Sequence, residues 1–256
     1  MSKIEWTDRT WNPVTGCTKV SPGCKHCYAE RMSERLRKMG VKKYKDAFTP
    51  TLHHHLLEEP KRWQKPAYIF VCSMSDLFQE SVPDSFIKDV ICTTFQARQH
   101  IYQVLTKRPE RMLTFFREIA RMQKHKNNIE LWGIHPHWTC PPLSNVWLGV
   151  SVEDQERLCR ADWLVQIPAP VRFLSVEPML GPVRDIPEGI NWVICGGESG
   201  PGARPMDPEW VRDLRDECVE KKIPFFLKQW GGANKKAAGR ELDGRTWDEM
   251  PEVQNG

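Results

Sequence analysis

Six short apolar runs recur along the 256 residues of this chain, and their regular spacing constrains its fold more than any other feature. Each run is rich in β-branched and aromatic residues, as in Tyr-Ile-Phe-Val-Cys at residues 68–72, and each ends in polar or small residues. Runs of this kind are typical of strands that are buried on both faces of a sheet. The six runs lie at residues 68–72, 101–105, 146–150, 171–175, 191–195 and 224–227.

Segments with helical spacing of apolar residues lie between these runs. They cover residues 83–91, 109–121, 153–166 and 208–221, and a further helix is expected at about 28–38. An initial strand is expected within residues 10–17. Strands that alternate with helices along a whole chain indicate a parallel sheet with helical crossovers. The pattern therefore predicts an α/β fold, in the form of one large barrel or sheet domain.

Two stretches interrupt this alternation. Residues 40–66 and 122–145 are rich in Pro, His, Lys and Trp and have weak periodicity, so we expect both to be insertions. Residues 231–256 contain several glycines and are expected to form an irregular C-terminal tail. The expected organisation is thus a single domain over residues 1–230, with two insertions, followed by the tail.

Composition favours a reduced, non-membrane environment. No apolar run is long enough to span a bilayer and the N-terminus lacks a signal-peptide pattern, so a cytoplasmic protein without a membrane partner is expected. Nine cysteines without an export signal argue against a disulfide framework. The net charge of +4 permits a polyanionic partner without requiring one.

Three of these cysteines stand close together in the chain. Cys17, Cys24 and Cys27 form a Cys-x6-Cys-x2-Cys loop. Three thiolates in one loop suit an iron–sulfur cluster that keeps one iron open, whereas a closed zinc site needs a fourth ligand. The alternative is a zinc site completed by His26 or by a distant residue such as Cys72.

Polar residues follow every predicted strand. Because the carboxyl ends of parallel strands meet at one edge of a sheet or barrel, these residues are expected to form one polar cavity together with the cysteine loop. They lie at residues 73–76, 106–108, 151–154, 175–177, 196–200 and 228–229.

With these features the chain resembles the radical S-adenosylmethionine (radical SAM) enzymes. The resemblance implies a partial (β/α)6-type TIM-like barrel with mostly parallel strands, and a [4Fe–4S] cluster held by Cys17, Cys24 and Cys27 on the loop after the first strand. The usual spacing in that superfamily is three residues and then two, whereas here it is six and then two. His26 occupies the penultimate loop position, which in the superfamily is commonly aromatic and lies near the adenine.

The resemblance also implies contacts to S-adenosylmethionine from strand ends. Ser73, Ser75 and Asp76 stand after the second strand, where the superfamily contacts the methionine amine. Ser151 and Glu153 stand after the fourth strand, where related enzymes contact the ribose and the methionine carboxylate.

Further candidates follow the later strands. Glu177 is one, and Gly196-Gly197-Glu198 resembles the superfamily's Gly-Gly-Glu element, although it follows the sixth strand rather than the second. We interpret it either as a close approach of backbone to ligand or as a tight turn. Four cations on the same edge are candidates to neutralise the cofactor carboxylate or a substrate phosphate. They are Lys107, Arg108, Arg204 and Lys228.

The chain resembles one family more closely, a phage- and bacteria-borne "three-Cys-motif" family, through most of its length. The matching segments are residues 10–17, 21–24, 73–78, 105–109, 145–153, 172–178, 196–200 and 228–232.

The function expected from these resemblances is reductive cleavage of S-adenosylmethionine to a 5′-deoxyadenosyl radical, followed by hydrogen abstraction from an organic substrate. The expected partners are S-adenosylmethionine, an external electron donor, a nucleotide or nucleic-acid substrate undergoing modification or repair, and a partner protein. Two alternatives stay open. One is a nucleic-acid-binding protein with a zinc knuckle, and the other is a non-catalytic iron–sulfur electron carrier or redox sensor.

Overall fold

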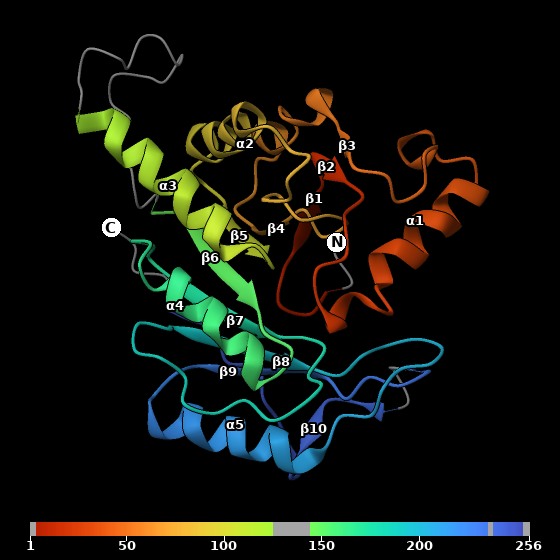
Figure 1. Ribbon diagram of the computed structural model, residues 1–256, viewed down its shortest axis with the longest axis vertical. Coiled ribbons are helices and arrows are strands. Elements are labelled where there is room, and N and C mark those ends of the chain that lie inside the picture. The colour runs from red at the N-terminus through yellow and green to blue at the C-terminus, as the bar shows by residue number, and fades with distance from the viewer. Residues whose placement is uncertain (1–3, 125–143, 235–237, 253–256) are drawn as a thin grey trace.

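A curled, fully parallel sheet organises the molecule. The computed structural model describes residues 4–124, 144–234 and 238–252. Its main sheet forms a half-barrel whose seven strands follow one another in chain order (Figure 1). The strands are β1 (Arg9–Trp11), β4 (Tyr68–Val71), β5 (Ile101–Thr106), β6 (Val146–Ser151), β7 (Arg172–Val176), β8 (Trp192–Gly196) and β9 (Phe225–Gln229).

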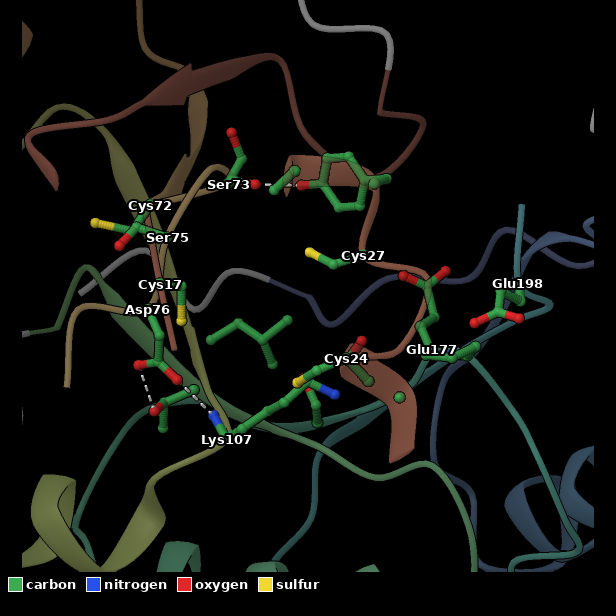
Figure 2. A pocket seen from close by; sticks show the side chains of 18 of the residues that line it. Cys17, Cys24, Cys27, Cys72, Ser73, Ser75, Asp76, Lys107, Glu177 and Glu198 are labelled. Atoms are coloured by element: carbon green, nitrogen blue, oxygen red, sulfur yellow. Dashed lines mark hydrogen bonds between the residues drawn. The ribbon is translucent and has the colours of Figure 1, made fainter. Parts of the chain in front are cut away.

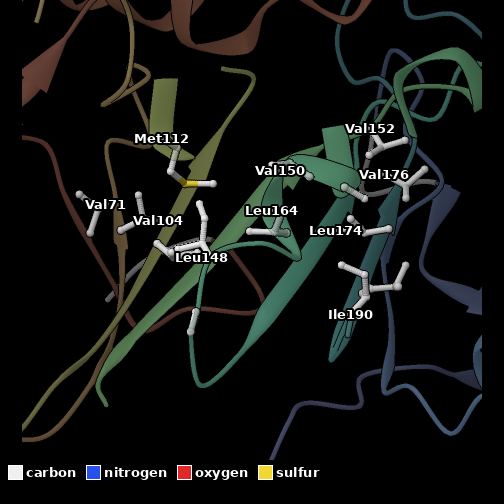
Figure 3. Close-up of a cluster of buried hydrophobic side chains, with 14 of the residues drawn as sticks. Val71, Val104, Met112, Leu148, Val150, Val152, Leu164, Leu174, Val176 and Ile190 are labelled. Atoms are coloured by element: carbon white, nitrogen blue, oxygen red, sulfur yellow. The ribbon is translucent and has the colours of Figure 1, made fainter. Parts of the chain in front are cut away.

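Helices connect these strands and cover the outer face of the sheet. Apolar side chains of the strands pack there against Met112 of α3 and Leu164 of α4 (Figure 3). Figure 1 shows α3, α4 and α5 along one flank of the sheet, with α1 on the other side of the molecule. The helices are α1 (Tyr28–Lys38), α2 (Asp84–Gln96), α3 (Pro109–Lys124), α4 (Arg160–Leu164) and α5 (Pro208–Glu220).

The prediction of a partial TIM-like barrel is confirmed, and each of the six apolar runs forms a strand of the sheet. The expected initial strand is divided in two, because Pro13 follows β1 and cannot donate a ladder hydrogen bond. Its second part, β2 (Val14–Thr15), pairs antiparallel with β3 (Thr51–Leu52) from the first insertion. The helix expected over 153–166 is a 3₁₀ turn, η7 (Gln155–Cys159), followed by the short α4.

The two insertions and the tail differ from one another. The first contains three further 3₁₀ turns, η2 (Lys42–Tyr44), η3 (His54–Leu56) and η4 (Pro60–Arg62). Most of the second, residues 125–143, lies outside the described residues. The tail, expected to be irregular, instead contains a hairpin of β10 (Glu241–Leu242) and β11 (Arg245–Thr246). No helix among residues 4–124, 144–234 and 238–252 has both the length and the apolar character needed to cross a bilayer.

The concave face of the half-barrel is filled by aromatic residues toward the amino ends of the strands. Trp6 packs there against Phe70, Phe173 and Trp192. Gly149 makes room for the Phe173 ring, since a Cβ at Gly149 would lie 2.4 Å from it. Because this aromatic layer closes one end, the inward-facing residues beyond it line a cavity at the carboxyl ends of the strands.

Candidate functional site

A cavity of about 430 Å³ lies at the carboxyl ends of the strands (Figure 2). Its volume is in the range typical of small-molecule sites. The cysteine loop and the ends of six strands line it, so the predicted convergence is what the structure contains. The sequence-predicted residues that line the cavity are Cys17, Cys24, His26, Cys27, Ser73, Ser75, Asp76, Lys107, Arg108, Ser151, Glu177, Gly197, Glu198 and Lys228. Glu153, Gly196 and Arg204 are not part of its lining.

The cysteine loop begins at a glycine held by two side chains and ends at a helix. At its start Gly16 has a φ of +78°, and its carbonyl accepts hydrogen bonds from Ser75 Oγ at 2.6 Å and Gln79 Nε2 at 2.8 Å. Cys24 ends a 3₁₀ turn, η1 (Pro22–Cys24), and Cys27 is the residue before α1. The three cysteines are thus held by the segment that follows β4, by a turn and by a helix terminus.

All three sulfurs face the same space. In Figure 2 the sulfurs of Cys17, Cys24 and Cys27 point toward the middle of the cavity, whereas the Cys72 sulfur points away from it. His26 Nδ1 lies 3.2 Å from Glu198 Oε2. Within the described part of the chain, no three His, Cys, Asp or Glu side chains lie close enough together to bind a single metal ion.

The environments of two thiols differ. Burial raises the pKa of Cys17 to about 11, with Asp76 acting in the same direction and Arg108 opposing it. Burial would also raise the pKa of Cys24, but backbone hydrogen bonds at Val20 and Ser21, with the charge of Lys107, bring it below its usual range. A cysteine that binds a metal must be a thiolate. The surroundings of Cys24 favour this form and those of Cys17 oppose it.

Each of the four predicted cations is paired with a carboxylate. Lys107 contacts Glu153, and Arg108 Nη1 lies 3.1 Å from Asp76 Oδ2. In the other half of the barrel, Arg204 Nη2 lies 2.5 Å from Glu198 Oε1 and Lys228 Nζ 2.8 Å from Glu177 Oε2. Ion pairs therefore form a ring at the edge of the cavity. Each of these four cations would contact a ligand only in addition to its carboxylate partner.

Glu153 supports the cysteine loop from beneath. It is fully buried and accepts hydrogen bonds from Ser21 Oγ at 2.6 Å, from Arg160 Nη1 at 2.9 Å and from Lys107. Gly23 crosses directly over it, because a Cβ at Gly23 would lie 2.5 Å from Glu153 Cγ. The three donors leave this carboxylate fixed in place as a support for the loop.

Asp76 is likewise saturated by the protein. Its Oδ1 accepts from Phe78 N at 2.9 Å and Thr106 Oγ1 at 2.7 Å, while Oδ2 accepts from Lys107 N at 2.9 Å and from Arg108. These bonds join the end of β4 to the end of β5. A methionine amine that contacted Asp76, as the resemblance implies, would therefore donate to carboxylate oxygens that already accept two hydrogen bonds each.

Two predicted serines also have partners within the protein. Ser73 Oγ donates to Asn12 Oδ1 at 3.1 Å, and Ser75 Oγ donates to the Gly16 carbonyl. Ser151 lies two strands further along the sheet and is buried at the end of β6. Ser73 and Ser75 thus fix the β4 end to the segment that carries Cys17.

The two glycines of the Gly-Gly-Glu segment allow close packing against neighbouring residues, and Gly197 and Glu198 also line the cavity. A Cβ at Gly196 would lie 2.4 Å from Glu177 Oε1, and one at Gly197 would lie 2.0 Å from the Trp230 carbonyl. Burial would raise the pKa of Glu198, but its bonds to Arg204 outweigh this and lower it to about 2. Close packing within the protein, which neither of the two interpretations invoked, therefore accounts for both glycines.

Three residues of the cavity have no individual role in the sequence-based predictions, although two of them belong to the predicted polar strand ends. Ser175 and Gln229 line it from β7 and β9, and Trp6 lines it from the N-terminal segment. Ser175 and Gln229 carried a signal, because both stand at the polar ends of apolar runs. Trp6 carried none, since its place depends on how residues before β1 enter the half-barrel.

Comparison with protein-family models gives one match that spans nearly the whole chain. The family is described as "Protein of unknown function (DUF5131)", and residues 1–251 match its model. The chain belongs to this family. A match of this extent fits the expectation of one family resemblance through most of the length.

Other comparisons add less. A search of curated proteins found no match. Among solved structures, the chain is similar to "Spore photoproduct lyase complexed with dinucleoside spore photoproduct", with 10% identity and a TM-score of 0.36. The likeness covers 81% of this chain and 59% of that one, so the chain spans about three-fifths of that protein's length.

Proposed function

We propose that the chain is an iron–sulfur enzyme of the radical SAM type, in which Cys17, Cys24 and Cys27 hold a [4Fe–4S] cluster. One observation carries the proposal. Three thiols from a single loop face one cavity at the carboxyl ends of a parallel half-barrel, and the Cys72 sulfur points away from them. Three protein thiolates leave one iron of such a cluster free to bind a small molecule.

The arrangement favours a cluster over a zinc ion. Thiolates that share one zinc lie about 4 Å apart, because each must stand about 2.3 Å from the metal in a tetrahedral site. No three potential ligands within residues 4–124, 144–234 and 238–252 meet that requirement. A four-iron cluster binds each cysteine through a different iron and so accommodates sulfurs that stand further apart. The zinc-knuckle alternative is thereby disfavoured.

Cys17, Cys24 and Cys27 would hold the cluster, which would supply one-electron reduction of S-adenosylmethionine with electrons from an external donor. The chain's own residues would orient the cofactor and exclude water. Glu177 is the strongest candidate for the methionine amine, because Lys228 holds its Oε2 while its Oε1 is buried and has no hydrogen-bond partner among the described residues. His26 remains the candidate for the adenine, and Ser151 for the ribose.

The deciding experiment is anaerobic purification and reconstitution with iron and sulfide, then addition of dithionite and S-adenosylmethionine. We expect a brown chromophore, about four irons for each chain, and formation of 5′-deoxyadenosine. Cys24→Ala is expected to lose both chromophore and product. Cys159→Ala, which removes an exposed thiol away from the cavity, is the matched control and should keep both.

Each alternative predicts a different result. About one equivalent of zinc without sulfide would favour the zinc knuckle. A stable cluster without binding of S-adenosylmethionine would favour an electron carrier. Full chromophore in Cys24→Ala would show that the ligand assignment is wrong.

A further inference from the structure

Three buried polar atoms of the cavity lining, outside both the cysteine loop and the ring of ion pairs, lack hydrogen-bond partners among the described residues. They are Ser175 Oγ on β7, Gln229 Oε1 on β9 and Trp6 Nε1. We propose that Ser175, Gln229 and the Trp6 ring form a substrate subsite for a neutral planar nitrogen heterocycle of the nucleobase kind. This inference rests on the proposed function, whose substrate class it names.

The Ser175 hydroxyl has no hydrogen-bond partner among the described residues. Its side chain is about 1% exposed and lies in register with Ser151 on β6 and Ile194 on β8. It follows Phe173 by two residues, so it stands directly above the aromatic layer. A buried hydroxyl without a partner costs about 1–3 kcal/mol. A ligand that bonds to the hydroxyl would remove that cost.

Gln229 reaches the cavity because the sheet is irregular at this point. The register of β8 and β9 shifts between Cys195 and Gly196, so that Gly196 pairs with Gln229 rather than with Lys228. A one-residue shift changes which side chain faces the interior. Gln229 Nε2 donates to the Gly197 carbonyl at 3.2 Å, which fixes the amide and leaves Oε1 as an acceptor toward the cavity.

The surface beneath these groups is aromatic. Trp6 and Phe70 line the same cavity, with ring centroids 4.7 Å apart. The indole N–H of Trp6 is also buried without an acceptor among the described residues. The subsite therefore contains an aromatic face, the Gln229 carbonyl oxygen as an acceptor, the Trp6 N–H as a donor, and the Ser175 hydroxyl, which can donate and accept. None of these groups is charged.

This set of groups matches a nucleobase better than the other groups of a nucleotide. A base has a planar face for an aromatic ring and an edge with both donors and acceptors. A phosphate would need cations, and those at this edge are already paired with carboxylates. A purely apolar substrate would leave Ser175 and Gln229 without partners.

The test uses Ser175→Ala in the reconstituted protein saturated with S-adenosylmethionine and kept unreduced. Calorimetric titration with thymidine, deoxycytidine, deoxyadenosine and deoxyguanosine should show binding of at least one nucleoside to the wild type. In Ser175→Ala we expect that affinity to fall about five- to tenfold, while the melting temperature stays the same or rises. A structural serine would behave otherwise, since its loss lowers the melting temperature.

Ser33→Ala is the matched control. Ser33 is buried in α1, but its Oγ donates to the Glu30 carbonyl at 2.8 Å. Its replacement should lower the melting temperature and leave nucleoside affinity unchanged. The iron–sulfur absorbance and the affinity for S-adenosylmethionine are measured for every variant.

Two results would overturn the inference. One is a wild type that carries the cluster and the cofactor but binds no nucleoside. The other is a Ser175→Ala variant that loses affinity for S-adenosylmethionine and not for the nucleoside, which would assign the subsite to the cofactor. A wild type without the chromophore would instead contradict the proposed function, and nucleoside titration of that protein would still decide the subsite.

Discussion

Gly23 shows how closely the cysteine loop is fitted to the barrel beneath it. The loop crosses Glu153 at this residue, and Glu153 cannot retreat because Ser21, Lys107 and Arg160 all hold its carboxylate. Sequence alone gives this glycine no special status, since Ser21-Pro22-Gly23-Cys24 has the composition of an ordinary turn. The requirement for glycine at position 23 comes from Glu153, which lies 130 positions further along the chain, at the end of another strand.

Gly23→Ala should therefore disturb the cluster loop. The added methyl would overlap Glu153, and overpacking of this kind costs about 1–3 kcal/mol in free energy of unfolding. We expect a lower melting temperature and less iron for each chain after reconstitution, both of which are directly measurable. Gly181→Ala is the control, because a Cβ there meets Asp154 Cβ at an ordinary 3.5 Å. Equal iron content in the two variants would contradict the role given to the close contact between Gly23 and Glu153.

At the scale of elements, the segments that follow two separate strands of the sheet, β5 and β8, both hold the cysteine loop. Arg108 after β5 bonds to Thr18, and Arg204 after β8 donates to the Pro22 carbonyl at 3.1 Å. From the sequence, polar residues could be placed at the strand ends, but their pairing could not. Lys107 meets Glu153 because β5 and β6 are neighbours, whereas Lys228 meets Glu177 from β9 to β7, with β8 between them. Pairings of the second kind depend on the curl of the sheet.

Arg204→Lys tests whether this clamp protects the cluster. Arg204 donates to Glu198 from both Nε and Nη2, and Nη2 also reaches the Pro22 carbonyl. A lysine has one nitrogen and no planar fork, so it cannot keep the bidentate contact that holds this arrangement. We expect the reconstituted cluster to be lost several times faster on exposure to an iron chelator, followed by the decay of its absorbance. Arg212→Lys, which alters an exposed pair with Asp243, should leave that rate unchanged. Identical rates for the two variants would mean that the clamp has no such role.

At the scale of the whole molecule, strand order was the most predictable feature and the tail the least. Six buried runs separated by helical segments leave few alternatives to a parallel sheet in chain order, because sequential connections of this kind are short and right-handed. The tail has no such periodicity, yet Leu242 and Trp247 are buried in the main core. Two isolated apolar residues among glycines and charges give no periodic signal, and their burial depends on an open edge at β9.

Trp247→Ala measures how much the tail contributes to the stability of the whole domain. The Trp247 ring lies 6.0 Å from that of Phe225, and its carbonyl accepts a hydrogen bond from Leu227 N at 2.8 Å, so the tail covers the last strand of the sheet. Losing a buried aromatic side chain costs about 3–5 kcal/mol, and urea unfolding should show a loss near the lower end of that range. Trp163→Ala removes the same side chain from a position that is 37% exposed, and should cost much less. A loss for Trp247→Ala no greater than that for Trp163→Ala would mean that the half-barrel is stable without its tail, and residues 231–256 would then be an appendage.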